Sequence, residues 1–248
     1  MGKTRKRESI KDSESFKIER GIFDERTLLN IYRLMNKGFI DTVESVVKEG
    51  KESVVLAGLD KQGRWVAIKV YRTLACDYKS MWKYLVGDPR IKGLKKDRWK
   101  VVSLWCKKEF KNLLRAKEGG VDCPQPIAFY QNVLVMEFIG KKGVPAPRLV
   151  DVELGNPERV YKKVVKNLEK IIKAGLVHGD FSAYNILFYK KPWIIDFSHA
   201  MPIKHHILAL DFLKKDIRNI SKFFSKLGVE VEDVEEVYRR LLQVVKGG

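Results

Sequence analysis

The segment HGDFSAYNIL, residues 178–187, carries polar side chains whose types and spacing could hold a metal ion beside a reacting group. Asp180 and Asn185 are five positions apart, and a second carboxylate, Asp196, follows the apolar run WII. Each of these residues alone is more typical of a turn, but the three together near predicted strand ends form a far more specific pattern. Oxygen ligands that converge in this way suit Mg²⁺, which completes its shell with water and phosphate oxygens.

A predicted hairpin brings two of these residues together. Asn185 precedes the apolar run ILF, and Asp196 ends the run WII beyond a turn at residues 190–192. Paired as antiparallel strands, the two runs place Asn185 beside Asp196, with Asp180 on the loop that leads in. Asp180 is then free to orient or deprotonate an attacking hydroxyl, and phosphoryl transfer needs little else besides positioning and charge neutralisation.

A site for phosphoryl transfer also needs a cation near the nucleotide. Lys69 ends the motif VAIK on a predicted hairpin strand, although an ordinary exposed strand lysine is the simpler alternative. Glu109 lies on a predicted long helix, and we expect it to pair with Lys69 and hold it over the phosphates. Glu118 is a weaker candidate because it lies at the end of that helix.

Two further segments are expected to contact the nucleotide. The turn EGKES would cover the triphosphate with Lys51, Ser53 and backbone N–H groups as donors, although it holds one glycine and is no glycine-rich loop. The segment LVMEFIG would join two lobes, with the backbone of Glu137 and Ile139 pairing with adenine.

Hydrophobic periodicity predicts the elements that position these residues. Asp24 is expected to cap a first helix in which Leu28, Leu29, Tyr32 and Met35 repeat at helical spacing and which ends at Gly38. The remaining predictions are hairpin strands within 42–73, a loop or partly ordered insertion at about 74–98, a helix over 99–118, strands within 127–140, a helix over 157–174, and helices near 205–227 and 231–246.

This order predicts an α+β fold with two lobes and a cleft between them. A basic arm, residues 1–20, precedes an N-terminal lobe, 21–137, made of an antiparallel sheet and one long helix. The hinge and a mostly helical lobe that holds the catalytic residues occupy 138–248.

Composition limits the classes of protein to which the chain can belong. It has 248 residues, and 49 Lys and Arg against 31 Asp and Glu give a net charge of +18. No apolar run approaches the roughly 20 residues of a membrane span, and the first residues lack a secretory signal. Three scattered cysteines indicate free thiols. We therefore expect a cytoplasmic protein with no membrane partner, and the charge favours a polyanionic partner.

With these residues in place, the sequence resembles the RIO family of atypical serine protein kinases, in particular its Rio-one branch, over about residues 22–245. An archaeal source is expected. The resemblance is carried by GKES in place of a glycine-rich loop, VAIKVYRT, GDPR in the basic insertion, WCKKEFKNLLRA, CPQPI, VLVMEFIGKKGVPAPRL, HGDFSAYNIL and IIDFSHA. Glu49 stands where many members have threonine, and Phe181 where leucine is common; the charge of Glu49 is expected to weaken nucleotide binding.

The resemblance implies a two-lobed kinase fold that binds ATP and Mg²⁺ (or Mn²⁺), phosphorylates serine, including its own, and acts in maturation of the small ribosomal subunit. Its implied partners are the pre-ribosomal particle, with rRNA and ribosomal proteins, and the chain itself; no DNA is expected. The positions that match the family give Lys69 as the ATP-binding lysine, Glu137 and Ile139 as hinge contacts, Asp180 as catalytic base, and Asn185 and Asp196 as metal ligands.

In this family the aspartate that matches Asp196 is also implicated as a transient phosphate acceptor, so the protein would act partly as an ATPase switch. Only 52 residues follow Asp196 (248 − 196). The C-terminal lobe is therefore expected to lack the helices that dock peptides in conventional protein kinases.

Three other hypotheses compete with this one. The pattern HGD, N and IDF is shared with small-molecule kinases of the aminoglycoside and choline type, which usually carry a longer helical insertion before the catalytic loop. The small kinase of the tRNA-modification assembly lacks the GDPR insertion and the VPAPRL linker. A non-catalytic RNA-binding module would not need Lys69, Asp180, Asn185 and Asp196 together.

The basic insertion and the helix after it have two interpretations. Residues 79–117 contain 13 Lys and Arg against three acidic residues, which could be a solvated helix face or a surface for RNA. This segment also holds Ser80 and Ser103, and we expect Ser80 to be the better autophosphorylation site because a flexible loop could reach the cleft.

Overall fold

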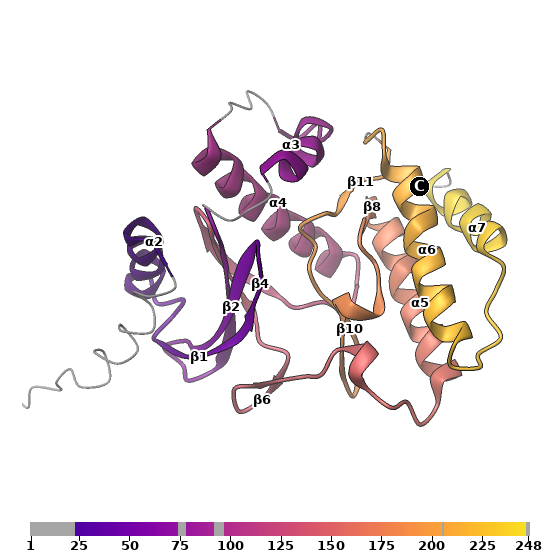
Figure 1. Cartoon of the computed structure of the whole chain (residues 1–248), viewed down its shortest axis with the longest axis horizontal. Helices are drawn as coiled ribbons and strands as arrows, with labels where there is room; N and C mark the ends of the chain where they lie inside the picture. Colours follow the sequence, from indigo (N-terminus) through magenta and orange to yellow (C-terminus); the bar gives the residue numbers. More distant parts are fainter. Residues whose placement is uncertain (1–22, 74–77, 92–96, 205, 247–248) are drawn as a thin grey trace, which may run out of the picture.

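The computed structural model describes residues 23–73, 78–91, 97–204 and 206–246 (Figure 1). The predicted basic arm, residues 1–20, lies outside this part of the chain. A five-stranded sheet with α2 (Glu25–Asn36) forms one end of the molecule and a group of helices forms the other, with α4 (Arg98–Glu118) between them. The predicted two-lobed α+β fold is confirmed.

The sheet is antiparallel throughout and sets the position of Lys69. Its order is β1 (Thr42–Glu49), β2 (Ser53–Leu59), β3 (Trp65–Tyr71), β5 (Val133–Glu137) and β4 (Pro126–Tyr130). Because side chains alternate along a strand, β3 buries Val66, Ile68 and Val70 against one core. Ala67 and Lys69 face the opposite side, where they line a cavity.

The first helix forms as predicted, but its most buried face includes polar residues and not the whole apolar repeat. Asp24 caps α2 by accepting a hydrogen bond from the Thr27 N–H at 2.8 Å. Leu29 is 56 % exposed, whereas Thr27, Asn30, Ile31 and Leu34 are buried. The polar pair faces inward because Asn132, at the β4–β5 turn, binds both side chains: its Nδ2 donates to the Thr27 hydroxyl at 2.9 Å, and its Oδ1 accepts from Asn30 at 2.8 Å.

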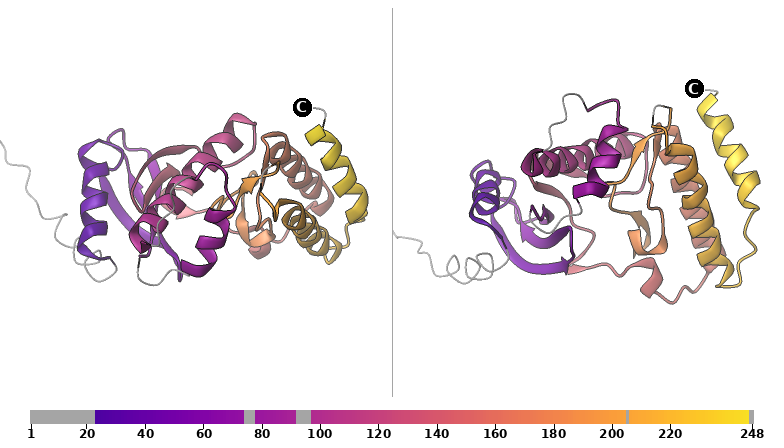
Figure 2. Two further views of the ribbon diagram at one scale, coloured as in Figure 1. Left: turned by 90° about the horizontal axis from the view of Figure 1, so that it is seen from above. Right: turned by 45° about the horizontal axis from the view of Figure 1, so that its top comes forward.

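The prediction of a loop over the insertion was wrong for its described part. Residues Tyr78–Val86 form helix α3, which packs against α4 (Figure 2). Met81 and Leu85, four positions apart, are 1 % and 0 % exposed in the core shared with α4. Because α3 has nine residues, fewer than an isolated helix needs to be stable in water, it depends on tertiary packing, which the local sequence does not reveal.

The C-terminal lobe consists of three helices that lie side by side in Figures 1 and 2, α5 (Pro157–Lys173), α6 (Ala209–Ser225) and α7 (Val234–Lys246). Val160, Val164, Leu168 and Ile171 form a buried apolar stripe on α5, and Asn156 caps this helix. Short pieces complete the lobe: strand pairs β6 (Gly140–Lys141) and β7 (Val144–Pro145), β8 (Leu176–Val177) and β11 (Met201–Pro202), β9 (Ile186–Tyr189) and β10 (Lys191–Ile194), and 3₁₀ turns η1 (Leu149–Asp151) and η2 (Ala183–Asn185).

Two hydrophobic cores hold these elements. The smaller lies between α2 and the sheet. The larger runs from the other face of the sheet through α4 into the C-terminal lobe, so that Trp105 and Leu113 of α4 belong to one core with Phe197 and Phe224. Along the described ranges, no helix is both long and apolar enough to cross a membrane.

Asn132→Ala tests the buried polar junction between α2 and the sheet. Its side chain is fully buried, and Nδ2 also donates to the Tyr71 carbonyl at 2.9 Å. The alanine leaves buried donors and acceptors unpaired, so we expect the free energy of unfolding to fall by about 3 kcal/mol, measured by urea denaturation. Asn36→Ala, at the exposed end of α2, is the matched control; equal losses in the two variants would contradict this role.

Candidate active site

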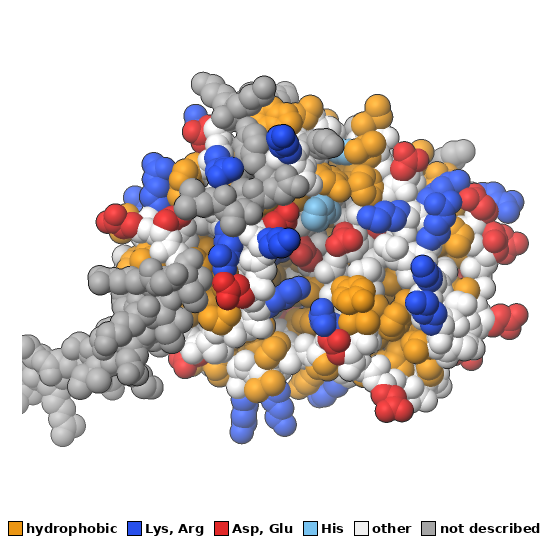
Figure 3. Space-filling view, viewed as in Figure 1, with side chains coloured by type: hydrophobic (Ala, Val, Ile, Leu, Met, Phe, Trp, Pro, Cys, Tyr) orange, Lys and Arg blue, Asp and Glu red, His pale blue; other side chains and the backbone are white. Residues whose placement is uncertain are grey.

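A cavity of about 550 Å³ lies between the sheet and the C-terminal lobe. Figure 3 shows this region as a hollow with acidic side chains at its base and Lys and Arg side chains along its edge. Most of the predicted site residues line it: Ser53, Lys69, Glu109, Glu137, Ile139, Asn185 and Asp196. Two predicted site residues do not line the cavity. Lys51 is exposed outside it, and Asp180 is connected to the cavity through its hydrogen bond with Asn185.

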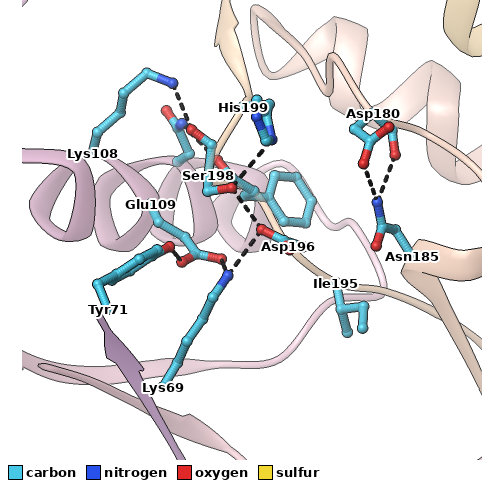
Figure 4. A network of polar contacts seen from close by, with 12 residues as sticks. Lys69, Tyr71, Lys108, Glu109, Asp180, Asn185, Ile195, Asp196, Ser198 and His199 are labelled. Carbon is cyan, nitrogen blue, oxygen red and sulfur yellow. Dashed lines mark hydrogen bonds and ion pairs between the residues drawn. The ribbon is translucent and has the colours of Figure 1, made fainter. Parts of the chain in front are cut away.

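Lys69 is the centre of a buried ion cluster (Figure 4). Its Nζ lies 2.9 Å from Glu109 Oε1 and 2.9 Å from Asp196 Oδ1, and the residue is 5 % exposed. The Tyr71 hydroxyl donates to the other oxygen of Glu109, which fixes that carboxylate on α4. Strand β3, helix α4 and the loop after β10 therefore meet at one ammonium group.

The charges in this cluster reinforce each other. Burial alone would lower the pKa of Lys69, but the carboxylates of Asp196 and Glu109 outweigh burial and raise it. Burial would raise the pKa of Asp196, yet the Lys69 ammonium and the Ser198 hydroxyl hold it well below its usual range. At neutral pH Lys69 is an ammonium and Asp196 a carboxylate.

Asp196 is held in a restrained conformation with one oxygen free for the cavity. Its φ of 62° lies in the left-handed region, which non-glycine residues seldom adopt. Ser198 Oγ donates to Oδ1 at 2.7 Å, the same oxygen that Lys69 contacts. The side chain is 38 % exposed, because it faces the open cavity, and Oδ2 is the oxygen that a metal ion or a phosphoryl group would meet.

Asn185 is oriented by Asp180. Its Nδ2 donates to the Asp180 carbonyl at 2.9 Å and to Asp180 Oδ2 at 2.7 Å, so its amide oxygen points away from Asp180 (Figure 4). The predicted hairpin is present, and the Ile195 N–H donates to the Asn185 carbonyl at 3.0 Å.

The donor set fits Mg²⁺. A carboxylate oxygen from Asp196 and an amide oxygen from Asn185 are hard ligands of the kind that Mg²⁺ takes, with waters and phosphate oxygens completing its shell. Among the described residues no group of three or more His, Cys, Asp and Glu side chains could hold a metal ion. These two oxygens therefore suit a metal that arrives with a phosphorylated ligand.

Asp216, on α6, supports the loop that carries Asp180, and the sequence reasoning missed it. Its carboxylate accepts the N–H groups of Gly179 and Phe181, each at 2.8 Å, on either side of Asp180. Burial raises its pKa to about 7, against the effect of those two bonds. The available signal was an acidic residue inside the apolar stripe of a predicted helix, between Leu213 and Ile217.

His178 braces the same loop from inside the lobe. It is fully buried, and its Nε2 lies 3.1 Å from the Ile195 carbonyl, which only accepts, so this nitrogen donates. Burial lowers the pKa of His178 to about 4, so the ring is neutral at pH 7.

Two more side chains of α4 hold the loop after Asp196, and neither was predicted from the sequence. Lys108 Nζ donates to the Ser198 carbonyl at 2.8 Å. Asn112 Nδ2 donates to the Phe197 carbonyl at 3.0 Å and the Ala200 carbonyl at 2.7 Å. Burial lowers the pKa of Lys108 to about 7.

The β1–β2 turn and the hinge both line the cavity, and part of their backbone is used within the protein. In the β1–β2 turn the Gly50 N–H donates to the Ser53 carbonyl at 2.9 Å. Glu49 forms an ion pair with Arg72 and does not line the cavity, so its extra charge is compensated locally. At the hinge, the Glu137 N–H and the Ile139 carbonyl are used within the protein, which leaves the Glu137 carbonyl and the Ile139 N–H as the candidates to pair with a base.

The depressed pKa of Lys108 predicts a pH-dependent stability. Between its folded pKa of about 7 and its ordinary value of 10.5, the unfolded chain binds a proton that the folded chain does not, so stability should rise with pH. We expect a slope of at most about 1.4 kcal/mol per pH unit from urea denaturation between roughly pH 7.5 and 8.5.

Lys108→Met should abolish this slope, whereas Lys107→Met, at the neighbouring exposed position, should retain it. The range stops below the titration of Cys106 and Tyr71, whose raised pKa values would oppose the effect. A slope that survives in the Lys108 variant would assign it to another group.

Comparison with known proteins identifies the family. The model of the RIO domain matches residues 54–237. The chain is 40 % identical to a RIO-type serine/threonine-protein kinase Rio1 from Haloferax volcanii over 90 % of this chain and 77 % of the relative, and 37 % identical to its namesake from Methanocaldococcus jannaschii over 94 % and 79 %.

A solved structure gives the same fold independently. The Rio2 kinase–ADP/Mg²⁺–phosphoaspartate complex from Chaetomium thermophilum superposes with a TM-score of 0.65 at 20 % identity, over 89 % of this chain and 70 % of that one. The sheet lobe, the ion cluster of Lys69 and the polar loop at Asp180 thus sit on a kinase-like scaffold. The chain belongs to the RIO family of serine/threonine-protein kinases.

Proposed function

We propose that this protein transfers the γ-phosphoryl group of ATP to serine, using the cavity between its lobes. The observation that carries the proposal is the cluster in which Lys69 contacts both Glu109 and Asp196 at 2.9 Å. A buried ammonium held between a helix and a metal-type carboxylate is the arrangement with which protein kinases position nucleotide phosphates.

Each side chain has a defined task in this reaction. Asp196 and Asn185 would hold Mg²⁺, which neutralises charge that develops on the phosphates. Lys69 binds phosphate oxygens, and the hinge backbone at Glu137 and Ile139 pairs with the base. Asp180 accepts a hydrogen bond from the attacking hydroxyl and takes its proton.

We further propose that Asp196 itself accepts the phosphoryl group. An Asp196 oxygen would attack the γ-phosphorus, ADP would leave, and water would then hydrolyse the acyl phosphate to restore the carboxylate. Support comes from the phosphoaspartate of the related Rio2 complex and from the orientation of Asp196, whose Oδ1 is occupied by Lys69 and Ser198.

Ser80 and Ser103 are both proposed acceptors for serine autophosphorylation. Ser80 lies on helix α3 and Ser103 on helix α4, and both are half-buried. The expectation that Ser80 lies on a flexible loop is therefore wrong, and loop flexibility no longer favours Ser80 over Ser103.

A role in maturation of the small ribosomal subunit in the cytoplasm is supported by one surface. Exposed Lys100, Lys107, Lys111 and Arg115 of α4 share one side of the helix, because they recur near multiples of its 3.6-residue period. We propose that this basic stripe contacts rRNA backbone. Of the 13 basic residues counted from the sequence, Lys108 is buried and holds the loop after Asp196 instead.

The hypotheses of a small-molecule kinase, a tRNA-modification kinase or a non-catalytic RNA-binding module gain no support from the relatives or from the cavity. The relatives described above carry RIO kinase names, not those of aminoglycoside, choline or tRNA-modification kinases. A non-catalytic module would have no need for a complete ion cluster inside a cavity.

Incubation with γ-labelled ATP and Mg²⁺ tests the two-step proposal. We compare the intact chain with Asp180→Ala and Asp196→Asn, and separate phosphoserine, acid-labile acyl phosphate and free phosphate. Asp196→Asn should lose every product, while Asp180→Ala should lose phosphoserine by roughly 100-fold or more and keep acyl phosphate.

Asp211→Asn, an exposed carboxylate on α6, is the control and should keep all three products. Acyl phosphate that persists in Asp196→Asn would place the acceptor elsewhere. Phosphoserine that persists in Asp180→Ala would remove Asp180 as the base.

RNA binding at the basic stripe should depend steeply on salt. Each phosphate contact contributes roughly −0.7 to −0.9 to the slope of log affinity against log salt concentration. The double variant Lys107→Gln/Lys111→Gln should therefore reduce the slope by about 1 to 2 units. Lys162→Gln, on the exposed side of α5 where it pairs with Glu158, should not change it; an affinity that hardly varies with salt would exclude the stripe.

A further inference from the structure

The loop that follows the metal-type carboxylate Asp196 is fixed through its carbonyl groups. Three of them, at Phe197, Ser198 and Ala200, accept hydrogen bonds from buried side chains of α4. Asp196 itself has a positive φ of 62°, a conformation that persists only where surrounding contacts impose it. The orientation of Asp196 therefore depends on those α4 side chains.

Asn112 provides two of the three bonds and has one correct orientation. It is fully buried, with Nδ2 directed at the Phe197 and Ala200 carbonyls. If the amide were turned over, Oδ1 would face two carbonyl oxygens and no hydrogen bond could form. Arg90 selects the correct orientation, because its Nη1 donates to Asn112 Oδ1 at 2.9 Å.

Arg90 is in turn held by Asp88 in the same insertion. Asp88 is 1 % exposed and accepts from Arg90 Nε at 2.8 Å, from Nη2 at 2.5 Å and from the Arg90 backbone N–H at 3.0 Å. Burial would raise the pKa of Asp88, but its bonds to Arg90 hold it below its usual range. Within the sequence GDPR, the Asp88 carboxylate therefore binds Nε and Nη2 of Arg90 and leaves Nη1 to bind Asn112. We call this Arg90–Asp88 pair the clamp.

The insertion also packs directly on this loop. Tyr84 of α3 meets His199 edge to face, with ring centroids 4.9 Å apart, and Trp105 of α4 lies 5.4 Å from the same ring. Helix α3, helix α4 and residues 197–200 thus pack together. The hydrogen bond from Arg90 to Asn112 is a polar connection between the clamp and the loop.

We propose that Arg90 is a positioning residue for the metal site: through Asn112 it holds the loop that orients Asp196, so the insertion sets how tightly the site retains its divalent ion. This inference rests on the proposed role of Asp196 as a metal ligand. Residues that support a ligand from behind typically change metal affinity by 10- to 100-fold. A partner or a modification that draws Arg90 away from Asn112 would release the metal without touching the cavity.

Mn²⁺ binding in the presence of ADP, followed by electron paramagnetic resonance of the free ion, tests the proposal without relying on activity. Arg90→Gln should weaken Mn²⁺ binding about tenfold and leave metal-free ADP binding unchanged. Arg90→Lys should behave like Arg90→Gln although it keeps the charge, because a lysine has one nitrogen where Arg90 uses Nε and Nη2 on Asp88 and Nη1 on Asn112.

The chain contains a matched control. Arg64 also binds a nearly buried aspartate, Asp60, through Nε at 2.7 Å and its own backbone N–H at 2.9 Å, at the β2–β3 turn away from the cavity. Arg64→Gln removes a comparable Arg–Asp clamp and should leave Mn²⁺ affinity unchanged, whatever it does to thermal stability.

Three results would overturn the proposal. Arg90→Gln could weaken Mn²⁺ binding no more than Arg64→Gln does, or Arg90→Lys could bind Mn²⁺ as tightly as the unaltered protein. The third is that Arg90→Gln weakens metal-free ADP binding as much as it weakens Mn²⁺ binding. In an Asp196→Asn background the Arg90 substitution should have no further effect on Mn²⁺ binding, and an additive loss would also count against it. If the unaltered protein failed to bind Mn²⁺ with ADP, the proposed function itself would fall, which is a separate outcome.

Discussion

The Lys69 ammonium is the constraint around which the active site is built. Three segments far apart in sequence meet at it: β3, α4 and the loop after β10. Two carboxylates so close together would repel each other in a buried place, and the ammonium between them removes that cost. A nucleotide that enters must compete with Asp196 for this ammonium, so its phosphates and metal take over contacts that the protein otherwise makes with itself.

Helix α4 organises the site from two of its sides. Glu109 faces the sheet and fixes Lys69, while Lys108 and Asn112 face the C-terminal lobe and fix the loop after Asp196. Because the core containing Trp105 and Leu113 continues into that lobe, the helix cannot move without disturbing both sets of contacts. The two lobes are therefore connected by polar and apolar interactions that share one element.

The parts of the site that could be predicted from the sequence are those that depend on local apolar periodicity and on turn residues. The hairpin next to Asn185 and the strand that carries Lys69 follow from alternation and turn residues. The pairing of Lys69 with Glu109 follows from a carboxylate on the predicted long helix. The inward face of α2 was missed because Thr27 and Asn30 are buried by a partner about 100 residues away. Helix α3 was missed because nine residues are too few to form a stable helix without the packing that α4 provides. Asp216 and Asn112 bind backbone groups of loops that are distant in sequence, and no local sequence pattern predicts such contacts.

The attachment of the Asp180 loop to α6 has a consequence for how this loop can move. Asp216 accepts the backbone N–H groups on both sides of Asp180 with its two carboxylate oxygens. Because both hydrogen bonds end on one side chain of α6, a displacement of this helix within the lobe would carry Gly179 and Phe181 with it. Asp180 would then shift relative to the cavity, so the packing of α6 controls a distance that no residue of the loop itself fixes.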